Sequence, residues 1–86
     1  MNVEKTLEER GNRYGTFVDN AETIQKCLEI LMEGKSAHKL WYTHREAIHM
    51  IVHKLARIVN GDADYKDSWV DIAGYATLMA KELTDD

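Results

Sequence analysis

The chain has 86 residues, a formal net charge of −4 at neutral pH and a single cysteine. Its length suits one domain, residues 1–86, while the lone cysteine excludes an intramolecular disulfide and the acidic balance argues against general binding to nucleic acid. The polar N-terminal stretch, and the absence of any apolar run of about 20 residues, predict a cytoplasmic protein without membrane association.

Five glycines and no proline divide the chain into segments of helical length. Residues 2–10 form the first, which Asn2 can cap and Gly11 can end. It is too short to be stable alone, so it must pack against the rest. Thr16 predicts the start of a second helix, whose apolar residues recur on one face as far as Gly34.

Two further helices are predicted in the second half of the chain. Thr43 and Glu46 have the spacing of a capping box at the start of a helix over residues 43–60, and a last helix is predicted over residues 64–83. All segments have a period near 3.6 residues and none alternates as a strand does. The fold class is therefore all-α: a small antiparallel helical bundle of three long helices plus a short N-terminal helix.

The apolar faces of these helices predict the core. Phe17, Ile24 and Leu31 lie on one face of the second helix, and Trp41 and Trp69 are expected to be core residues as well. Because a domain of this size buries only roughly 60–65% of the surface of its unfolded chain, self-association into a homo-oligomer is also expected.

Positively charged residues form the first candidate site. The stretch ERGNRYG places Arg10, Arg13 and Tyr14 at the end of the first segment, and Arg57 follows on the polar face of the third helix. These groups could bind phosphate and stack on a base, or they could form intramolecular ion pairs with nearby acids, and both interpretations stay open. The predicted ligand-binding residues are Arg10, Arg13, Tyr14, His53, Lys54, Arg57 and Trp69.

Acidic residues form the second candidate site. Carboxylates on facing helices are the hard oxygen ligands that Mg²⁺ prefers, and Glu46, Asp67 and Asp71 are the candidate metal ligands. Acids in the first turn also stabilise a helix through its dipole, without any ligand. His49 and His53 have the spacing of a shared metal site, although a third ligand is not evident.

Three stretches, ERGNRYG, HKLARIVNG and YKDSWVDIAGYATL, together resemble a family of small uncharacterised proteins encoded by phages and prophages. The resemblance runs from about residue 9 to residue 83 and implies a location in the host cytoplasm. Its most specific element corresponds here to Asp67, Trp69, Asp71, Ala73, Gly74 and Tyr75.

A more distant similarity is to the MazG-type all-α nucleotide pyrophosphohydrolases, which hold Mg²⁺ with two pairs of carboxylates. Glu46 and Asp71 match that pattern, whereas His49 and Ser68 stand where two further glutamates would be. The similarity implies a nucleotide-type ligand, and the missing carboxylates favour binding without turnover.

Three functional hypotheses follow. The first is a phage-type helical protein that binds a nucleotide-derived phosphorylated ligand without turnover, needs no cofactor, and could sequester a host defence signal. The second is a Mg²⁺-dependent MazG-like nucleotide pyrophosphohydrolase. The third is a protein-interaction module directed against a host protein.

Overall fold

The computed structural model describes residues 2–83, which form four α-helices and one short 3₁₀ helix, without a strand. The elements are α1 (Val3–Tyr14), α2 (Phe17–Leu31), η1 (Ala37–Lys39), α3 (Tyr42–Asn60) and α4 (Lys66–Glu82). The all-α prediction is confirmed. None of the described helices is long and apolar enough to cross a membrane.

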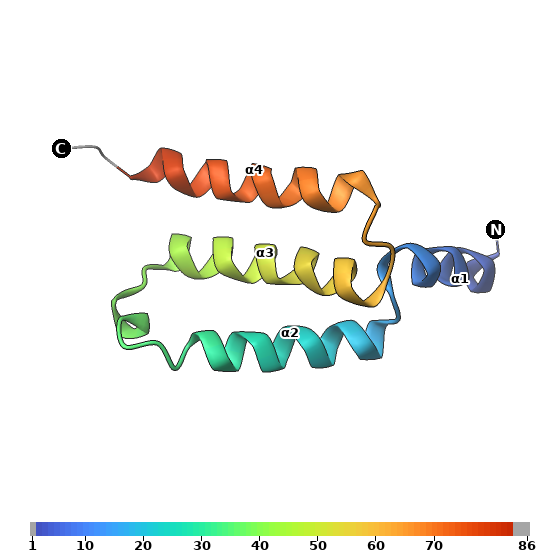
Figure 1. Ribbon diagram of the computed structural model, residues 1–86, viewed down its shortest axis with the longest axis horizontal. Helices are drawn as coiled ribbons and strands as arrows, with labels where there is room; N and C mark the ends of the chain where they lie inside the picture. The colour runs from blue at the N-terminus through green and yellow to red at the C-terminus, as the bar shows by residue number, and fades with distance from the viewer. Residues whose placement is uncertain (1, 84–86) are drawn as a thin grey trace.

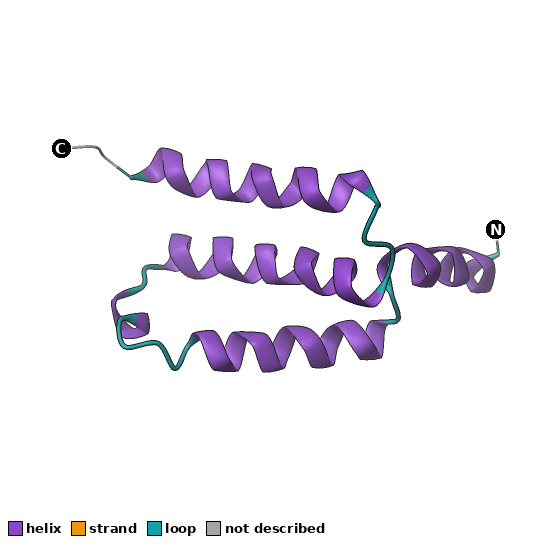
Figure 2. Cartoon of the chain, in the orientation of Figure 1, coloured by secondary structure: helices purple, strands orange, loops and turns teal. Residues whose placement is uncertain are grey.

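Helices α2, α3 and α4 lie side by side, with α3 in the middle, and neighbouring helices run in opposite directions (Figure 1). The principal contacts join α3 to α4, α2 to α3 and, to a smaller extent, α1 to α3. The short α1 projects beyond one end of this layer, and the longest connection, residues 32–41 between α2 and α3, contains η1 (Figure 2). The arrangement is an open layer, because α2 and α4 lie on opposite sides of α3.

The core lies where α2 meets α3. Ile24 from α2 and Val52 and Ala56 from α3 are buried there, and Cys27, Leu28 and Ile48 pack against them. Two residues predicted for the core are exposed instead: Phe17 keeps 86% of its surface accessible and Trp41 keeps 76%. Trp69 and Leu31 keep 51% and 46% of their surfaces accessible. These core predictions were wrong because apolar periodicity identifies the side of a helix that is apolar, but not whether another element covers it.

The helix boundaries differ from the predicted ones at several points. Helix α1 continues through Gly11 and ends at Tyr14, because its C-cap Gly15 has a positive φ of 86°, and the Gly15 N–H donates to the Gly11 carbonyl. Helix α2 ends at Leu31, before the predicted Gly34. The predicted caps Asn2 and Thr16 are confirmed, since each side chain accepts a hydrogen bond from a backbone N–H of its own helix.

The starts of α3 and α4 also differ from the predictions. Helix α3 begins with Trp41 as its N-cap, and the Trp41 N–H donates to Nδ1 of His44, 3.0 Å away. The predicted capping box of Thr43 and Glu46 was therefore wrong, because the helix starts two residues earlier and His44 takes the role predicted for Glu46. Helix α4 begins at Lys66, with Tyr65 as N-cap.

A contact between two glycines joins the end of α1 to the end of α3. A Cβ atom on Gly61 would lie 2.6 Å from the Arg13 carbonyl oxygen, and one on Gly15 would lie 2.8 Å from the Asn60 Cβ. Only hydrogen fits in this space. The Asp62 N–H donates a hydrogen bond to the Arg13 carbonyl at 2.9 Å and stabilises this contact. We call this contact the glycine joint.

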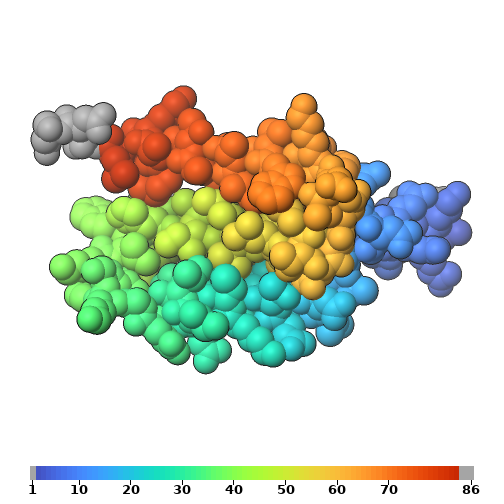
Figure 3. Space-filling view, viewed as in Figure 1, coloured from blue at the N-terminus to red at the C-terminus, as the bar shows by residue number. Residues whose placement is uncertain are grey.

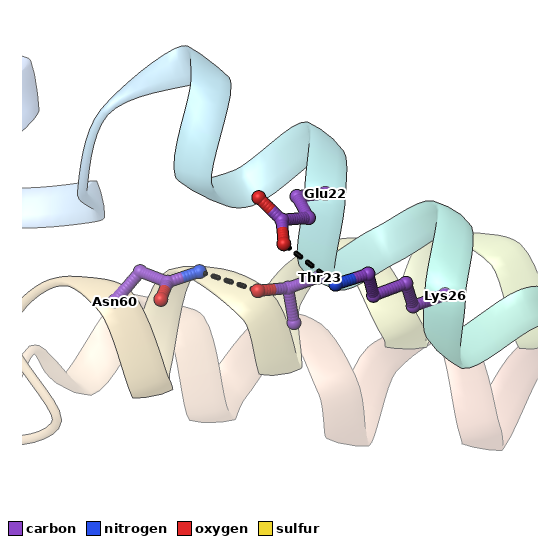
Figure 4. A network of polar contacts seen from close by, with 4 residues as sticks. All are labelled: Glu22, Thr23, Lys26 and Asn60. Carbon is purple, nitrogen blue, oxygen red and sulfur yellow. Dashed lines mark hydrogen bonds and ion pairs between the residues drawn. The ribbon is translucent and has the colours of Figure 1, made fainter.

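Amide side chains surround the glycine joint and complete its hydrogen bonding. The Asn20 Nδ2 donates to the Tyr14 carbonyl at 2.7 Å, and the Asn60 Nδ2 donates to Asn20 Oδ1 at 3.1 Å and to Thr23 Oγ1 at 3.0 Å. Figure 4 shows the bond between Asn60 and Thr23 that ties the end of α3 to α2. The ends of three helices are thus joined by one polar network.

We expect Gly61→Ala to lower the free energy of unfolding by about 1–3 kcal/mol, because the added methyl group collides with rigid backbone. The matched control is Gly11→Ala, where a Cβ meets nothing within 4 Å. Inside a helix, that change should stabilise the protein by up to about 1 kcal/mol. Urea unfolding followed by circular dichroism, at one protein concentration, measures both. Equal effects of the two substitutions would show that the glycine joint is not tightly packed.

Candidate functional site

The glycine joint brings three guanidinium groups and two tyrosine rings together. The Cζ atoms of Arg10 and Arg57 lie 5.0 Å and 4.7 Å from the centroid of the Tyr14 ring, and that of Arg13 lies 6.0 Å from it. Arg13 also lies 4.7 Å from the centroid of the Tyr65 ring. We call these residues the arginine–tyrosine cluster: Arg10, Arg13, Tyr14, Arg57 and Tyr65.

The cluster holds its positive charges against aromatic faces instead of carboxylates. The Tyr14 and Tyr65 rings meet edge to face, with centroids 5.7 Å apart, and each offers a face to a guanidinium group. Within residues 2–83 the ion pairs join Lys26 to Glu22 and Lys54 to Asp71, and neither includes an arginine. Cation–π contacts of this kind contribute about 0.5–1 kcal/mol at exposed sites, less than a bound anion would.

The pKa values of the two tyrosine hydroxyls are shifted in opposite directions. Desolvation raises the pKa of Tyr14, but hydrogen bonding with Tyr65 and Arg13 and the positive charges of Arg13 and Arg10 outweigh it, and the pKa lies below its ordinary value. Tyr65 donates its hydroxyl to Asp67 Oδ2 at 3.0 Å, and this bond is the main reason why its pKa is raised. Tyr14 is therefore the better hydrogen-bond donor toward an anion.

A groove with a volume of about 450 Å³ borders the cluster. Its walls come from both sides of the glycine joint, with Leu7 and Phe17 as the apolar part and Arg10, Tyr14 and Arg57 as the polar part. The volume falls within the range of about 300–1,000 Å³ that is typical of small-molecule sites. The groove can therefore accept a ligand with an anionic group and an apolar or aromatic group.

Three of the predicted ligand-binding residues lie outside the cluster. Lys54 Nζ pairs with Asp71 Oδ2 at 3.1 Å, at the contact between α3 and α4, and only 13% of the Lys54 side chain is exposed. Trp69 donates its Nε1–H to the Ala63 carbonyl at 2.8 Å. His53 lies one turn before Arg57 on α3, with its ring centroid 4.9 Å from that of His49. Arg10, Arg13, Tyr14 and Arg57 are the predicted residues that the structure brings together.

The predicted metal ligands Glu46, Asp67 and Asp71 are not gathered into one site. Asp67 accepts the Tyr65 hydroxyl, and Asp71 pairs with Lys54. Glu46 precedes Lys54 by eight residues on α3, which is about 12 Å along the helix axis. Among residues 2–83, no group of three or more His, Cys, Asp or Glu residues is arranged to hold a metal ion.

Sequence reasoning missed Tyr65 as a site residue. The last helix was predicted to start at residue 64, which assigned Tyr65 to its core face. Because α4 starts at Lys66, Tyr65 is the N-cap residue, and its ring lies against Arg13 and Tyr14. The one sequence signal for Tyr65 as a site residue was its position at the end of the glycine-containing turn stretch NGDADY.

The fold and the cluster define a small all-α protein with a cationic and aromatic site where its helices meet. The chain belongs to the family described as a domain of unknown function, DUF6378, and the match spans residues 2–83. No curated protein and no solved structure matches it. The family's description gives neither an origin nor a reaction, so the phage origin and the similarity to MazG-type hydrolases stay predictions.

We expect His53 to titrate below the ordinary histidine pKa of 6.5. Desolvation is the main cause, and the nearby charges of His49, Arg57 and Lys54 act in the same direction, against a smaller opposing effect of Glu46. The stabilising contribution of neutral His53 is full above about pH 6.5 and is lost as the pH falls through its folded-state pKa. Histidine NMR titration measures this pKa, and His49→Gln should raise it. Titration of His53 at or above 6.5 would contradict the desolvated environment.

We expect a double-mutant cycle on Lys54 and Asp71 to give a larger coupling energy than a cycle on Glu22 and Lys26. In the first pair only 13% of the Lys54 side chain is exposed and Asp71 keeps 48% exposed, whereas the side chains of the second pair keep 70% and 60% exposed. A coupling of about 1 kcal/mol is expected for the partly buried Lys54–Asp71 pair, against about 0.3–0.5 kcal/mol for the exposed i, i+4 pair. Urea unfolding of Lys54→Met, Asp71→Asn and the double variant measures the first energy. Equal couplings would leave Asp71 without a structural role.

Proposed function

We propose that the protein binds a phosphorylated, nucleotide-derived ligand at the arginine–tyrosine cluster and does not turn it over. The observation that carries this proposal is the convergence of Arg10, Arg13 and Arg57 around Tyr14, with no carboxylate paired to them among residues 2–83. In a chain with a net charge of −4, three guanidinium groups gathered without an ion pair to any of the described residues are a local exception.

The chemistry of the cluster suits a phosphate group joined to an aromatic base. A guanidinium group can donate two parallel hydrogen bonds to phosphate oxygens, and such charge-assisted bonds are roughly twice as strong as neutral ones. A phosphate would draw the guanidinium groups off the Tyr14 ring, and the ring would then offer a stacking surface to the base. Arg10 and Arg13 belong to α1 and Arg57 to α3, so a bound phosphate would bridge two helices.

Binding without turnover agrees with the arrangement of the acidic residues. A hydrolase of the MazG type requires several carboxylates around Mg²⁺. Asp67 accepts a hydrogen bond from Tyr65, Asp71 pairs with Lys54, and Glu46 lies eight residues before Lys54 on α3. In a phage setting, a binder of this kind, acting as a homo-oligomer in the host cytoplasm, would remove a nucleotide-derived defence signal from its receptor.

Isothermal titration calorimetry in the presence of EDTA tests the proposal, with nucleoside mono-, di- and triphosphates and cyclic dinucleotides as probes. At least one class should bind, and Arg57→Gln should weaken binding at least about tenfold through the loss of a charge-assisted contact. Arg45→Gln is the matched control, because Arg45 is exposed near the start of α3, at the end away from the cluster.

Three outcomes would contradict the proposal. No probe binds even at millimolar concentration, or Arg57→Gln binds as well as the natural protein. Alternatively, the protein releases pyrophosphate from nucleoside triphosphates with Mg²⁺, and Asp71→Asn abolishes the reaction, which would establish the hydrolase alternative. A stable host protein recovered in pull-down experiments, together with neither binding nor turnover, would favour the interaction module.

A further inference from the structure

The described chain exposes far more surface than a monomer of its mass. Its accessible surface is 6915 Å², whereas a folded monomer of 9.9 kDa is expected to expose roughly 5,200 Å². The radius of gyration is 15.0 Å, against about 12 Å for a compact chain of 86 residues, and the molecule measures 51 × 25 × 23 Å. Part of the excess belongs to α1, which projects from the layer and has no buried residue among those described, and part belongs to the exposed side of the three-helix layer.

One side of this layer is apolar across two helices. On α3 the residues Ile48, Ile51, Leu55 and Val59 follow one another at helical spacings of three and four, so they form one ridge. Ile48 and Ile51 line a groove of about 340 Å³ whose other wall is α4, through Ala76, Ala80 and Leu83. We call this surface the apolar face: Ile48, Ile51, Leu55, Val59, Ala76, Ala80 and Leu83.

The apolar face lies away from the arginine–tyrosine cluster. Arg57 follows Leu55 by two residues, about 200° around the helix, so the two side chains leave α3 on opposite sides. The residues of the apolar face carry no formal charge, and Val59 and Leu83 keep 69% and 57% of their surfaces exposed. In the space-filling view, α3 is uncovered between α2 and α4 (Figure 3).

We propose that the apolar face packs against the same face of a second copy of this chain, forming a two-fold symmetric dimer in which the two layers close into one helical bundle. A second copy fits the surface for two reasons. The chain as a whole exposes about 1,700 Å² more than a monomer of its mass, of which the apolar face is one part, and a standard interface takes about 800 Å² from each partner. The face combines a ridge of branched side chains with a groove walled by alanines, and a surface with both features complements its own two-fold copy.

The dimer also explains the thin core of the single chain. Ile24, Val52, Ala56 and Ile58 are the buried hydrophobic residues among those described, and no large side chain there is fully buried. Stacking two layers would bury Leu55 and Val59 against their counterparts and give each copy the second layer that helical domains require. This inference does not depend on the proposed ligand.

Analytical ultracentrifugation tests the proposal on a matched pair of variants. The natural protein should sediment as a species of twice the 9.9 kDa mass of one chain. Val59→Glu places a charge on the apolar face and should give a monomer. Val18→Glu places the same charge on α2 outside that face and should stay dimeric, and the two valines start from nearly equal exposures of 69% and 70%.

A second measurement covers the case in which Val59→Glu fails to fold. The melting temperature of the natural protein should rise with protein concentration, as it does when folding and association are linked, and that of Val18→Glu should rise in the same way. A natural protein that is monomeric at every concentration would overturn the proposal. So would a dimer that survives Val59→Glu, or one that Val18→Glu disrupts equally, since the interface would then lie elsewhere.

Discussion

The close approach of two backbone segments at Gly15 and Gly61 is the constraint on which the rest of this structure depends. None of the described residues of α1 is buried, so burial of apolar surface does little to hold this helix in place. Its position is set instead by the contact of the two glycines, by the bond from Asp62 to the Arg13 carbonyl, and by the amide of Asn20. A larger residue at either glycine would move the whole of α1 relative to α3.

The same joint accounts for the concentration of positive charge. Gathering Arg10, Arg13 and Arg57 costs electrostatic free energy, and the Tyr14 ring offsets only a part of it by lying between them. A rigid connection is therefore needed to keep α1 from swinging away and relieving the repulsion. Proteins retain such locally unfavourable arrangements where an anion restores the balance, which connects the geometry of the joint to the proposed ligand.

The sequence was sufficient to predict the helical class, the caps at Asn2 and Thr16, and the grouping of Arg10, Arg13 and Tyr14 near the third helix. Each of these depends on local chemistry or on helical period, which are visible in a single chain. The exposure of Phe17 and Trp41 could not be predicted, because it depends on which helices cover which sides. Ion pairing of the cations with nearby acids was one of the two interpretations left open, and which cation pairs with Asp71 depends on the register of α3 against α4. The role of Tyr65 depends on a shift of two residues in the start of α4.

Helix α3 separates the arginine–tyrosine cluster from the apolar face. Its polar side carries Arg57 and its apolar side carries Leu55, so a ligand on one side and a second copy on the other would not compete for space. They would nevertheless act on the same element. A phosphate bridging α1 and α3 would strengthen the glycine joint, whereas a second layer would hold α3 in place against α4, so the two events would stabilise different contacts of the same helix. Ligand binding and association could then occur on one molecule at the same time, because no residue is shared between the two sites.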